Sequence, residues 1–177
     1  MKRPYMNTEI KFNTDENAAT IYVMKVLHTT VDKVWKHFTQ KDLIDQWWAP
    51  KPWKCETTKM NFEKDGEWHY AMVSPDNEKH FAGAHYHEIN FYRSFDWTDF
   101  FADEEGNINS EMPGSNWLIG FTGVDEGTKL TINIHFKSRQ DLQESLKMGF
   151  EQGFKSGLNQ LEDLLNKKGH CPVKCVS

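Results

Sequence analysis

Cysteine is scarce in this sequence, which contains only three cysteines in 177 residues. So few cysteines, in an odd number, do not make the disulfide framework on which small secreted domains depend. The sequence therefore predicts a fold held together by its core, in a reducing, cytoplasmic setting. Cys171 and Cys175 follow His170 near the C-terminus, but their spacing is not that of a metal-binding motif.

Long apolar runs and clusters of basic residues are also missing. Nothing approaches the roughly 18 consecutive apolar residues of a membrane-spanning helix, and residues 1–20 are polar. We therefore expect no membrane span and no signal peptide. The net charge is −5, and no segment combines lysine and arginine with aromatic residues. The sequence thus does not predict nucleic-acid binding.

Aromatic residues are abundant, with seven tryptophans and twelve phenylalanines. These large, rigid side chains suit the walls of a ligand cavity, and they suit the interior of a packed core equally well. The length fits one domain that buries roughly 70% of the surface of its extended chain. We expect a polar lead-in over residues 1–17, one domain over 18–168 and a flexible tail over 169–177.

Alternation and turn residues predict a mostly β structure. Residues 18–28 are rich in β-branched and aromatic residues, which predicts a first strand. Residues 31–38 and 43–48 carry apolar side chains at helical spacing and predict two short helices. Six alternating runs between residues 53 and 138, separated by turn-forming residues, predict an antiparallel meander.

One long amphipathic helix is predicted over residues 141–168. Gly149, Gly153 and Gly157 recur every four residues near the middle of its apolar side. Each glycine inside a helix costs about 1 kcal/mol relative to alanine, so something must compensate. Either the helix backbone packs closely against the sheet, or the missing side chains leave room for a ligand. Both explanations hold if the helix packs tightly at one end and stands off at the other.

The order of these elements, with four short motifs, resembles a known family. The motifs are LIDQWWAP at 43–50, DGEWHYAM at 65–72 followed by PD at 75–76, TKLT at 128–131, and MGFEQGF at 148–154. Together they are similar to the activator of Hsp90 ATPase homologue family, within the START-like (SRPBCC, birch-allergen-like) superfamily. The resemblance spans residues 18–166. Glu67 and Phe154 stand where that family usually has glycine and tryptophan.

The resemblance implies an α+β helix-grip fold. In this fold a curved antiparallel sheet (one strand, two short helices and a six-strand meander) wraps around a long C-terminal α-helix. Members of the superfamily hold lipids, hormones or polyketides between the helix and the sheet, and some catalyse cyclisations. One branch stimulates a chaperone ATPase. The resemblance by itself does not decide among these functions.

Alternation along the strands, and the apolar side of the helix, give a set of candidate ligand-binding residues. They are Trp68, Tyr70, Met72, Trp97, Asp99, Trp117, Ile119, Phe121, Ile132, Ile134, Phe150, Gly153, Phe154 and Gly157. As a set they face a helix that bears glycine, which favours a cavity. The alternative for each residue is a place in a packed core without a cavity.

Asp99 alternates with Phe95, Trp97 and Phe101, which would place its carboxylate among aromatic rings. Burial there would raise its pKa and make it a candidate general acid or ligand anchor. Alternatively, a bulge or a strand end lets Asp99 reach solvent. His85 shares a strand face with His87, but zinc needs three or four ligands and the sequence offers no convincing third. We therefore predict no metal site and no cofactor.

Three functions stay open at the level of the sequence. The leading hypothesis is binding of an apolar small molecule between the long helix and the sheet, without covalent chemistry. Asp99, Tyr70 or a histidine would orient the ligand. The second hypothesis is a cyclase or lyase in the same cavity, with Asp99 or His85 moving protons. The third is a protein-interaction domain that contacts a chaperone, and a homodimer is also compatible with the sequence.

Overall fold

The computed structural model describes residues 9–112 and 114–169. Its elements, in chain order, are β1 (Lys11–Asp15), β2 (Thr20–Leu27), α1 (Val31–Thr39), α2 (Lys41–Ile44), β3 (Lys54–Met60), β4 (Glu67–Val73), β5 (Lys79–Asn90), β6 (Ser94–Ala102), β7 (Ser115–Val124), β8 (Gly127–Phe136), α3 (Arg139–Lys147) and α4 (Phe150–Gly169). The strands form one antiparallel sheet of eight strands in the order β1-β2-β8-β7-β6-β5-β4-β3. The predicted six-strand meander is confirmed as β3–β8.

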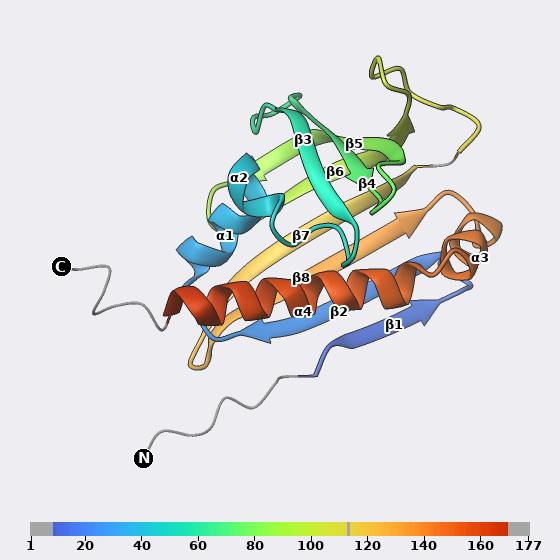
Figure 1. The fold of residues 1–177 in the computed structure, drawn as a ribbon. Helices are drawn as coiled ribbons and strands as arrows, with labels where there is room; N and C mark the ends of the chain where they lie inside the picture. Colours follow the sequence, from blue (N-terminus) through green and yellow to red (C-terminus); the bar gives the residue numbers. More distant parts are fainter. Residues whose placement is uncertain (1–8, 113, 170–177) are drawn as a thin grey trace.

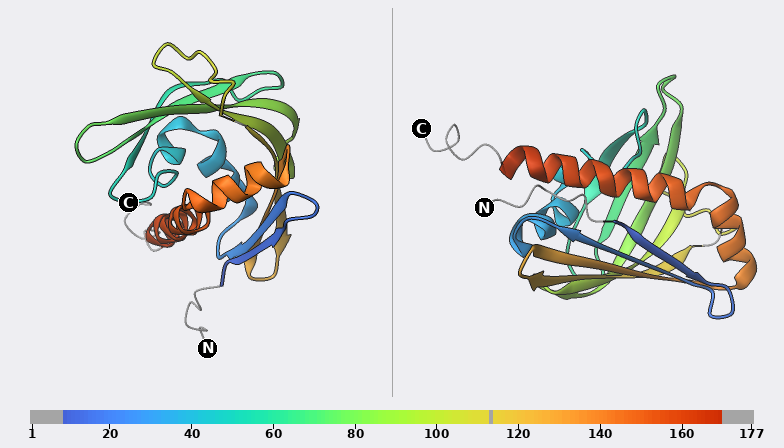
Figure 2. Two further views of the ribbon diagram at one scale, coloured as in Figure 1. Left: turned by 90° about the vertical axis from the view of Figure 1, so that its right-hand side faces the viewer. Right: turned by 90° about the horizontal axis from the view of Figure 1, so that it is seen from below.

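The sheet curves around α4, which lies on its concave side (Figures 1 and 2). This is the helix-grip arrangement, so the predicted α+β fold class is confirmed. Strand β8 illustrates how the sequence produces it. Leu130, Ile132 and Ile134 are buried on the inner face, while Thr131 and Asn133 lie between them on the outer face. A period of two places one apolar row against the helix.

The N-terminal part of the chain contains a strand that the sequence analysis did not predict. Residues 1–17 were expected to be a polar lead-in, yet Lys11–Asp15 form β1 and pair antiparallel with β2. Most of β1 is exposed, so its side chains carry little of the alternation that marks a half-buried strand. β1 forms because the edge of β2 has backbone N–H and C=O groups that need hydrogen-bond partners, and β1 supplies them.

The predicted single helix over residues 141–168 is wrong in one respect, because it is two helices. Ser138 caps α3, its hydroxyl accepting a hydrogen bond from the amide of Asp141 at 3.1 Å. The chain then breaks at Met148 and Gly149, where Gly149 has φ +86°, a left-handed conformation that favours glycine. Helix α4 continues to Gly169, and the tail with His170, Cys171 and Cys175 lies outside the described residues.

Helix α4 is attached to the sheet by apolar packing and by one buried ion pair. Leu158, Leu161 and Leu165 are buried in the core. Nζ of Lys25 on β2 lies 2.8 Å from Oε2 of Glu162 on α4, and the two side chains are 1% and 8% exposed. Within residues 9–112 and 114–169, no helix combines the length and the apolar content needed to cross a membrane.

Candidate functional site

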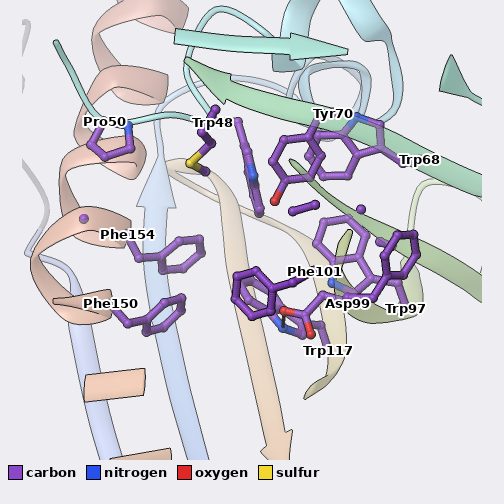
Figure 3. A pocket seen from close by; sticks show the side chains of 16 residues that line it. Trp48, Pro50, Trp68, Tyr70, Trp97, Asp99, Phe101, Trp117, Phe150 and Phe154 are labelled. Carbon is purple, nitrogen blue, oxygen red and sulfur yellow. Dashed lines mark hydrogen bonds between the residues drawn. The ribbon is translucent and has the colours of Figure 1, made fainter. Parts of the chain in front are cut away.

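A cavity of about 260 Å³ lies between the N-terminal half of α4 and the inner face of the sheet (Figure 3). Its lining residues come from β4, β5, β6, β7, α4 and the segment after α2. They are Trp48, Pro50, Trp68, Tyr70, Met72, Ala82, Gly83, Ala84, Trp97, Asp99, Phe100, Phe101, Trp117, Phe150, Gly153 and Phe154. The walls are mostly aromatic, with few polar groups, which is typical of a site for an apolar small molecule.

Nine of the fourteen predicted ligand-binding residues line this cavity. They are Trp68, Tyr70, Met72, Trp97, Asp99, Trp117, Phe150, Gly153 and Phe154. The strands bring them together because paired residues share a face: Ala84 lies opposite both Trp68 and Asp99, and Trp97 lies opposite Trp117. The period of two along these strands therefore correctly predicts which strand faces point toward the helix.

The other predicted residues lie outside the cavity lining. Ile119, Phe121, Ile132 and Ile134 are buried in the core. The ring centroid of Phe121, for example, lies 5.1 Å from that of Trp35 on α1. These residues share the inner face of the sheet, but α1 covers the end of β7 where Phe121 lies. Alternation identifies the face, and only the tertiary packing decides which part of it stays open.

The three helix glycines have three different surroundings. A Cβ on Gly157 would lie 3.4 Å from the backbone oxygen of Trp47 and 3.5 Å from that of Trp48, so the helix packs closely there. A Cβ on Gly153 would meet only Pro50 Cγ, at 3.8 Å, and Gly153 lines the cavity. Gly149 lies in the break between α3 and α4 and not inside a helix. The helix therefore packs tightly at Gly157 and stands off at Gly153.

Trp48 is the main cavity residue that the sequence analysis did not select. Its ring centroid lies 5.3 Å from that of Trp68 and 5.8 Å from that of Trp97. It also lies 6.1 Å from that of Phe154, so it joins the sheet to the helix. The sequence predicts a short helix over residues 43–48 that includes Trp48, but α2 ends at Ile44 and Trp48 lies in the irregular segment that follows.

Gln160 on α4 positions the segment that carries Trp48. Its Nε2 donates to the backbone oxygens of Trp47, at 3.1 Å, and Ala49, at 2.9 Å. Its Oε1 accepts from the amide of Lys51 at 2.8 Å. One side chain thus makes three hydrogen bonds to the backbone on both sides of Trp48, and we regard it as a positioning residue.

Replacing Gln160 with leucine should destabilise the protein by about 1–3 kcal/mol, because three backbone groups of the Trp48 segment lose their partner. The free energy of unfolding in urea measures this loss. Asn159→Leu is the matched control, since Asn159 is the exposed neighbour on the same helix. Equal stability of the two variants would show that the Trp48 segment does not depend on Gln160.

Asp99 lies on the inner face of β6, at the cavity wall (Figure 3). Its Oδ1 accepts a hydrogen bond from the amide of Ser115 at 2.5 Å, and Trp117 Nε1 donates to Oδ2 at 3.1 Å. The Ser115 hydroxyl lies 3.1 Å from both carboxylate oxygens. Burial raises the pKa of Asp99 to about 6, although these hydrogen bonds lower it in part. Asp99 thus titrates near neutrality inside an apolar cavity.

The raised pKa of Asp99 should make stability depend on pH. The folded protein holds this proton more tightly than the unfolded chain, so the contribution is fully present below pH ~4 and is lost as the pH rises through about 6. Its size is up to about 3 kcal/mol. We expect the free energy of unfolding of the wild type, measured in urea, to fall relative to that of Asp99→Asn as the pH rises from about 4 through about 6. Parallel pH profiles of the two proteins would contradict the assignment.

Other polar groups on the cavity wall are neutral. Burial raises the pKa of the Tyr70 hydroxyl, which therefore stays protonated at neutral pH. The indole Nε1 of Trp97 is buried, with no hydrogen-bond partner within residues 9–112 and 114–169. An unpartnered buried donor costs about 1–3 kcal/mol, a cost that an acceptor on a ligand would relieve.

His85 does not reach this cavity. It lies opposite Thr98 on β6, whereas its neighbour Ala84 lies opposite Asp99, so His85 and Asp99 point to opposite faces of the sheet. On the outer face its ring lies 3.5 Å from Glu67 Oε2 and 3.6 Å from Asp65 Oδ1. The two candidate proton carriers are therefore not brought together. The described part of the chain holds no group of three metal-ligating side chains placed to share an ion.

Comparison with known proteins gives one family and several solved structures. The sequence profile described as Activator of Hsp90 ATPase homolog 1-like protein matches residues 28–166. The crystal structure of protein Ms6760 from Mycobacterium smegmatis is 26% identical, with a TM-score of 0.82 over 89% of this chain and 97% of that one. No curated protein matches the chain.

Two structures determined by NMR are similar as well. The Staphylococcus epidermidis protein is 28% identical, with a TM-score of 0.77, and the match covers 90% of this chain and 94% of that one. The Arthrobacter aurescens protein is 23% identical, with a TM-score of 0.84, covering 89% of this chain and 91% of that one. At that identity the Arthrobacter likeness shows the fold alone.

Proposed function

The chain belongs to the Activator of Hsp90 ATPase homolog 1-like family, of the START-like type, and on that basis we propose that it binds an apolar small molecule in the cavity between α4 and the sheet. Binding is non-covalent. The family supports a ligand-binding or chaperone-associated role in general. What favours ligand binding in this chain is the aromatic cavity beneath Gly153, where α4 stands off from the sheet.

The proposed binding relies on burial of apolar surface, with a few polar groups that orient the ligand. Four of the seven tryptophans line the cavity: Trp48, Trp68, Trp97 and Trp117. Such rings give a ligand a large contact area at little cost in conformational entropy. Asp99, the Tyr70 hydroxyl and the unpartnered indole N–H of Trp97 supply the polar contacts. A ligand with an apolar body and one or two polar groups matches this wall.

Titration with N-phenyl-1-naphthylamine, a neutral apolar dye, tests the proposal. Dye bound among the four tryptophans should accept their excitation energy, so tryptophan emission should fall and dye emission rise, saturating at one dye per chain. An apolar ligand should compete with the dye. Absence of saturable energy transfer in the folded protein would contradict binding in this cavity.

A chaperone-associated role is the second candidate, and one surface feature favours it. The turn between β5 and β6 exposes Phe91 and Tyr92, which are 67% and 49% accessible. This turn lies at the opposite end of these strands from Ala82 and Phe101, which line the cavity. Exposed neighbouring aromatic residues of this kind are enriched at protein interfaces.

A chaperone assay distinguishes ligand binding from a chaperone-associated role. The ATPase rate of a purified Hsp90-type chaperone from the same organism should rise on addition of this chain if the second candidate holds. The double variant Phe91→Ser/Tyr92→Ser should lose that effect and keep dye binding. An unchanged ATPase rate with the wild-type chain rejects the second candidate and leaves the first untouched.

A further inference from the structure

A second cavity, of about 350 Å³, adjoins the first. It lies between α3, the break at Gly149 and the residues that precede β7. The two cavities share four wall residues, which are Asp99, Phe101, Trp117 and Phe150. Because these side chains line both spaces, the two cavities lie side by side at Asp99.

The second cavity differs from the first in its charge. Four carboxylates line it, those of Asp99, Glu111, Asp141 and Glu144, and no lysine, arginine or histidine does. Among residues 9–112 and 114–169, none of the four makes an ion pair. Gln140 Nε2 donates to Glu144 at 3.4 Å, and Asp99 is held by Ser115 and Trp117. The negative charge around this space therefore has no cationic partner within the described chain.

Aromatic rings make up much of the remaining wall. Phe101, Trp117, Phe136 and Phe150 all line the second cavity. The faces of aromatic rings carry partial negative charge and attract organic cations, which is how aromatic cages recognise alkylated ammonium groups. Rings and carboxylates in one cavity thus favour the same kind of group, for two independent physical reasons.

A bare metal ion fits this arrangement less well than an organic cation. A metal ion requires several ligand atoms that converge at about 2–2.6 Å. The described residues contain no group of three His, Cys, Asp or Glu side chains placed to share an ion. The carboxylates are part of the lining of a cavity of about 350 Å³, which has room for a bulky ammonium group.

We propose that the ligand is a cationic amphiphile, an organic amine whose apolar body fills the first cavity and whose ammonium group lies in the second, near Asp99, Asp141 and Glu144. This inference rests on the proposed function and adds the charge of the ligand to it. Met112 and Met148, which are exposed, also line the second cavity and add apolar surface to it. Anionic amphiphiles such as fatty acids are disfavoured by the same carboxylates.

Three probes with the same ring system and different charge test the inference by calorimetry. They are (1-naphthyl)methylammonium, (1-naphthyl)methanol and 1-naphthoate, at neutral pH and low ionic strength. We expect the ammonium probe to bind at least about tenfold more tightly than the alcohol, which corresponds to about 1.4 kcal/mol, and the carboxylate to bind weakest. Added salt should reduce this preference, because it screens the partly exposed charges.

The double variant Asp141→Asn/Glu144→Gln should reduce the preference for ammonium over alcohol to within about threefold. Asp125→Asn/Glu126→Gln is the matched control, because it also removes two carboxylates, both exposed, from the turn between β7 and β8, far from α3 (Figure 1). This control should keep the full preference. Loss of the preference in this control as well would mean that overall charge, and not the cavity, produces it, and would overturn the inference.

Failure of the inference differs from failure of the proposed function. If the alcohol or the naphthoate binds as tightly as the ammonium probe, the ligand is not selected for positive charge, and apolar binding in the cavity still stands. If none of the three probes binds and the neutral dye does not bind either, both proposals are wrong. Tight binding of the ammonium probe alone supports both.

Discussion

Gly153→Leu is expected to abolish uptake of apolar ligands, with a loss of dye affinity of at least about a hundredfold. The variant should still fold, because the Cβ makes only an ordinary contact with Pro50 and leucine is a better helix former than glycine by almost 1 kcal/mol. Its remaining carbon atoms then occupy the cavity that the ligand would fill. Dye titration and thermal unfolding measure the two effects.

Ser156→Leu is the matched control for this experiment. Ser156 lies on the same helix and is exposed, so the same side chain is added outside the cavity. Dye affinity should stay at the wild-type value there. Gly153→Leu with unchanged uptake would place the ligand somewhere other than beneath α4 and would contradict binding in this cavity.

Lys25→Met is expected to cost about 3–5 kcal/mol of stability, which is a large fraction of the net stability of a single domain. Lys25 and Glu162 form an ion pair of 2.8 Å with almost no exposure, and removing the lysine leaves the Glu162 carboxylate buried without its cation. Because this pair joins β2 to α4, the helix that closes the cavity should loosen as well. Urea unfolding measures the loss.

The double variant Lys25→Met/Glu162→Leu distinguishes two contributions to stability. One is the cost of leaving the Glu162 carboxylate buried and unpaired, and the other is the stabilisation that the ion pair itself provides. Replacing both partners with apolar residues removes the buried carboxylate, so most of the lost stability should return. A double variant as unstable as Lys25→Met would mean that the ion pair itself holds α4 on the sheet. A single variant of wild-type stability would mean that the pair is not buried as described.

The fold could be predicted because its elements follow local rules. Alternation in β8, the capping residue Thr30 of α1 and the turn residues between strands each act within a few positions of the chain. The N-cap is an example: the Thr30 side chain accepts from the amide of Lys33 at 3.4 Å, and threonine is among the residues that favour this position. Such local rules predict where helices and strands lie and which of their faces are buried.

The open part of the inner face could not be predicted in the same way. Trp68 and Ile132 both satisfy the alternation, yet Trp68 lines the cavity and Ile132 lies in the packed core. The difference arises from helices that are distant in sequence. Trp48 was assigned to a short helix over residues 43–48, but α2 ends at Ile44, and the irregular segment that carries Trp48 is held by Gln160, more than a hundred residues later. No sequence periodicity carries that information.

The glycines at 149, 153 and 157 show, in one segment, what the sequence could predict and what it could not. Their spacing correctly indicated an unusual helix face. The helix packs closely against its neighbours at Gly157 and leaves open space at Gly153. The break at Gly149 was missed because a glycine at helical spacing has the same letter whether its φ is negative or positive. Only the backbone conformation distinguishes a helix end from a helix interior.

Native mass spectrometry tests whether the cavity beneath α4 holds a small molecule. The chain is purified from its source cells, or incubated with a small-molecule extract of those cells, and measured under native and denaturing conditions. We predict a native species heavier than the chain by one small molecule, which is released on denaturation and carries an apolar body with an amine. A native mass equal to that of the bare chain, both after purification from source cells and after incubation with the extract, would contradict ligand binding in this cavity.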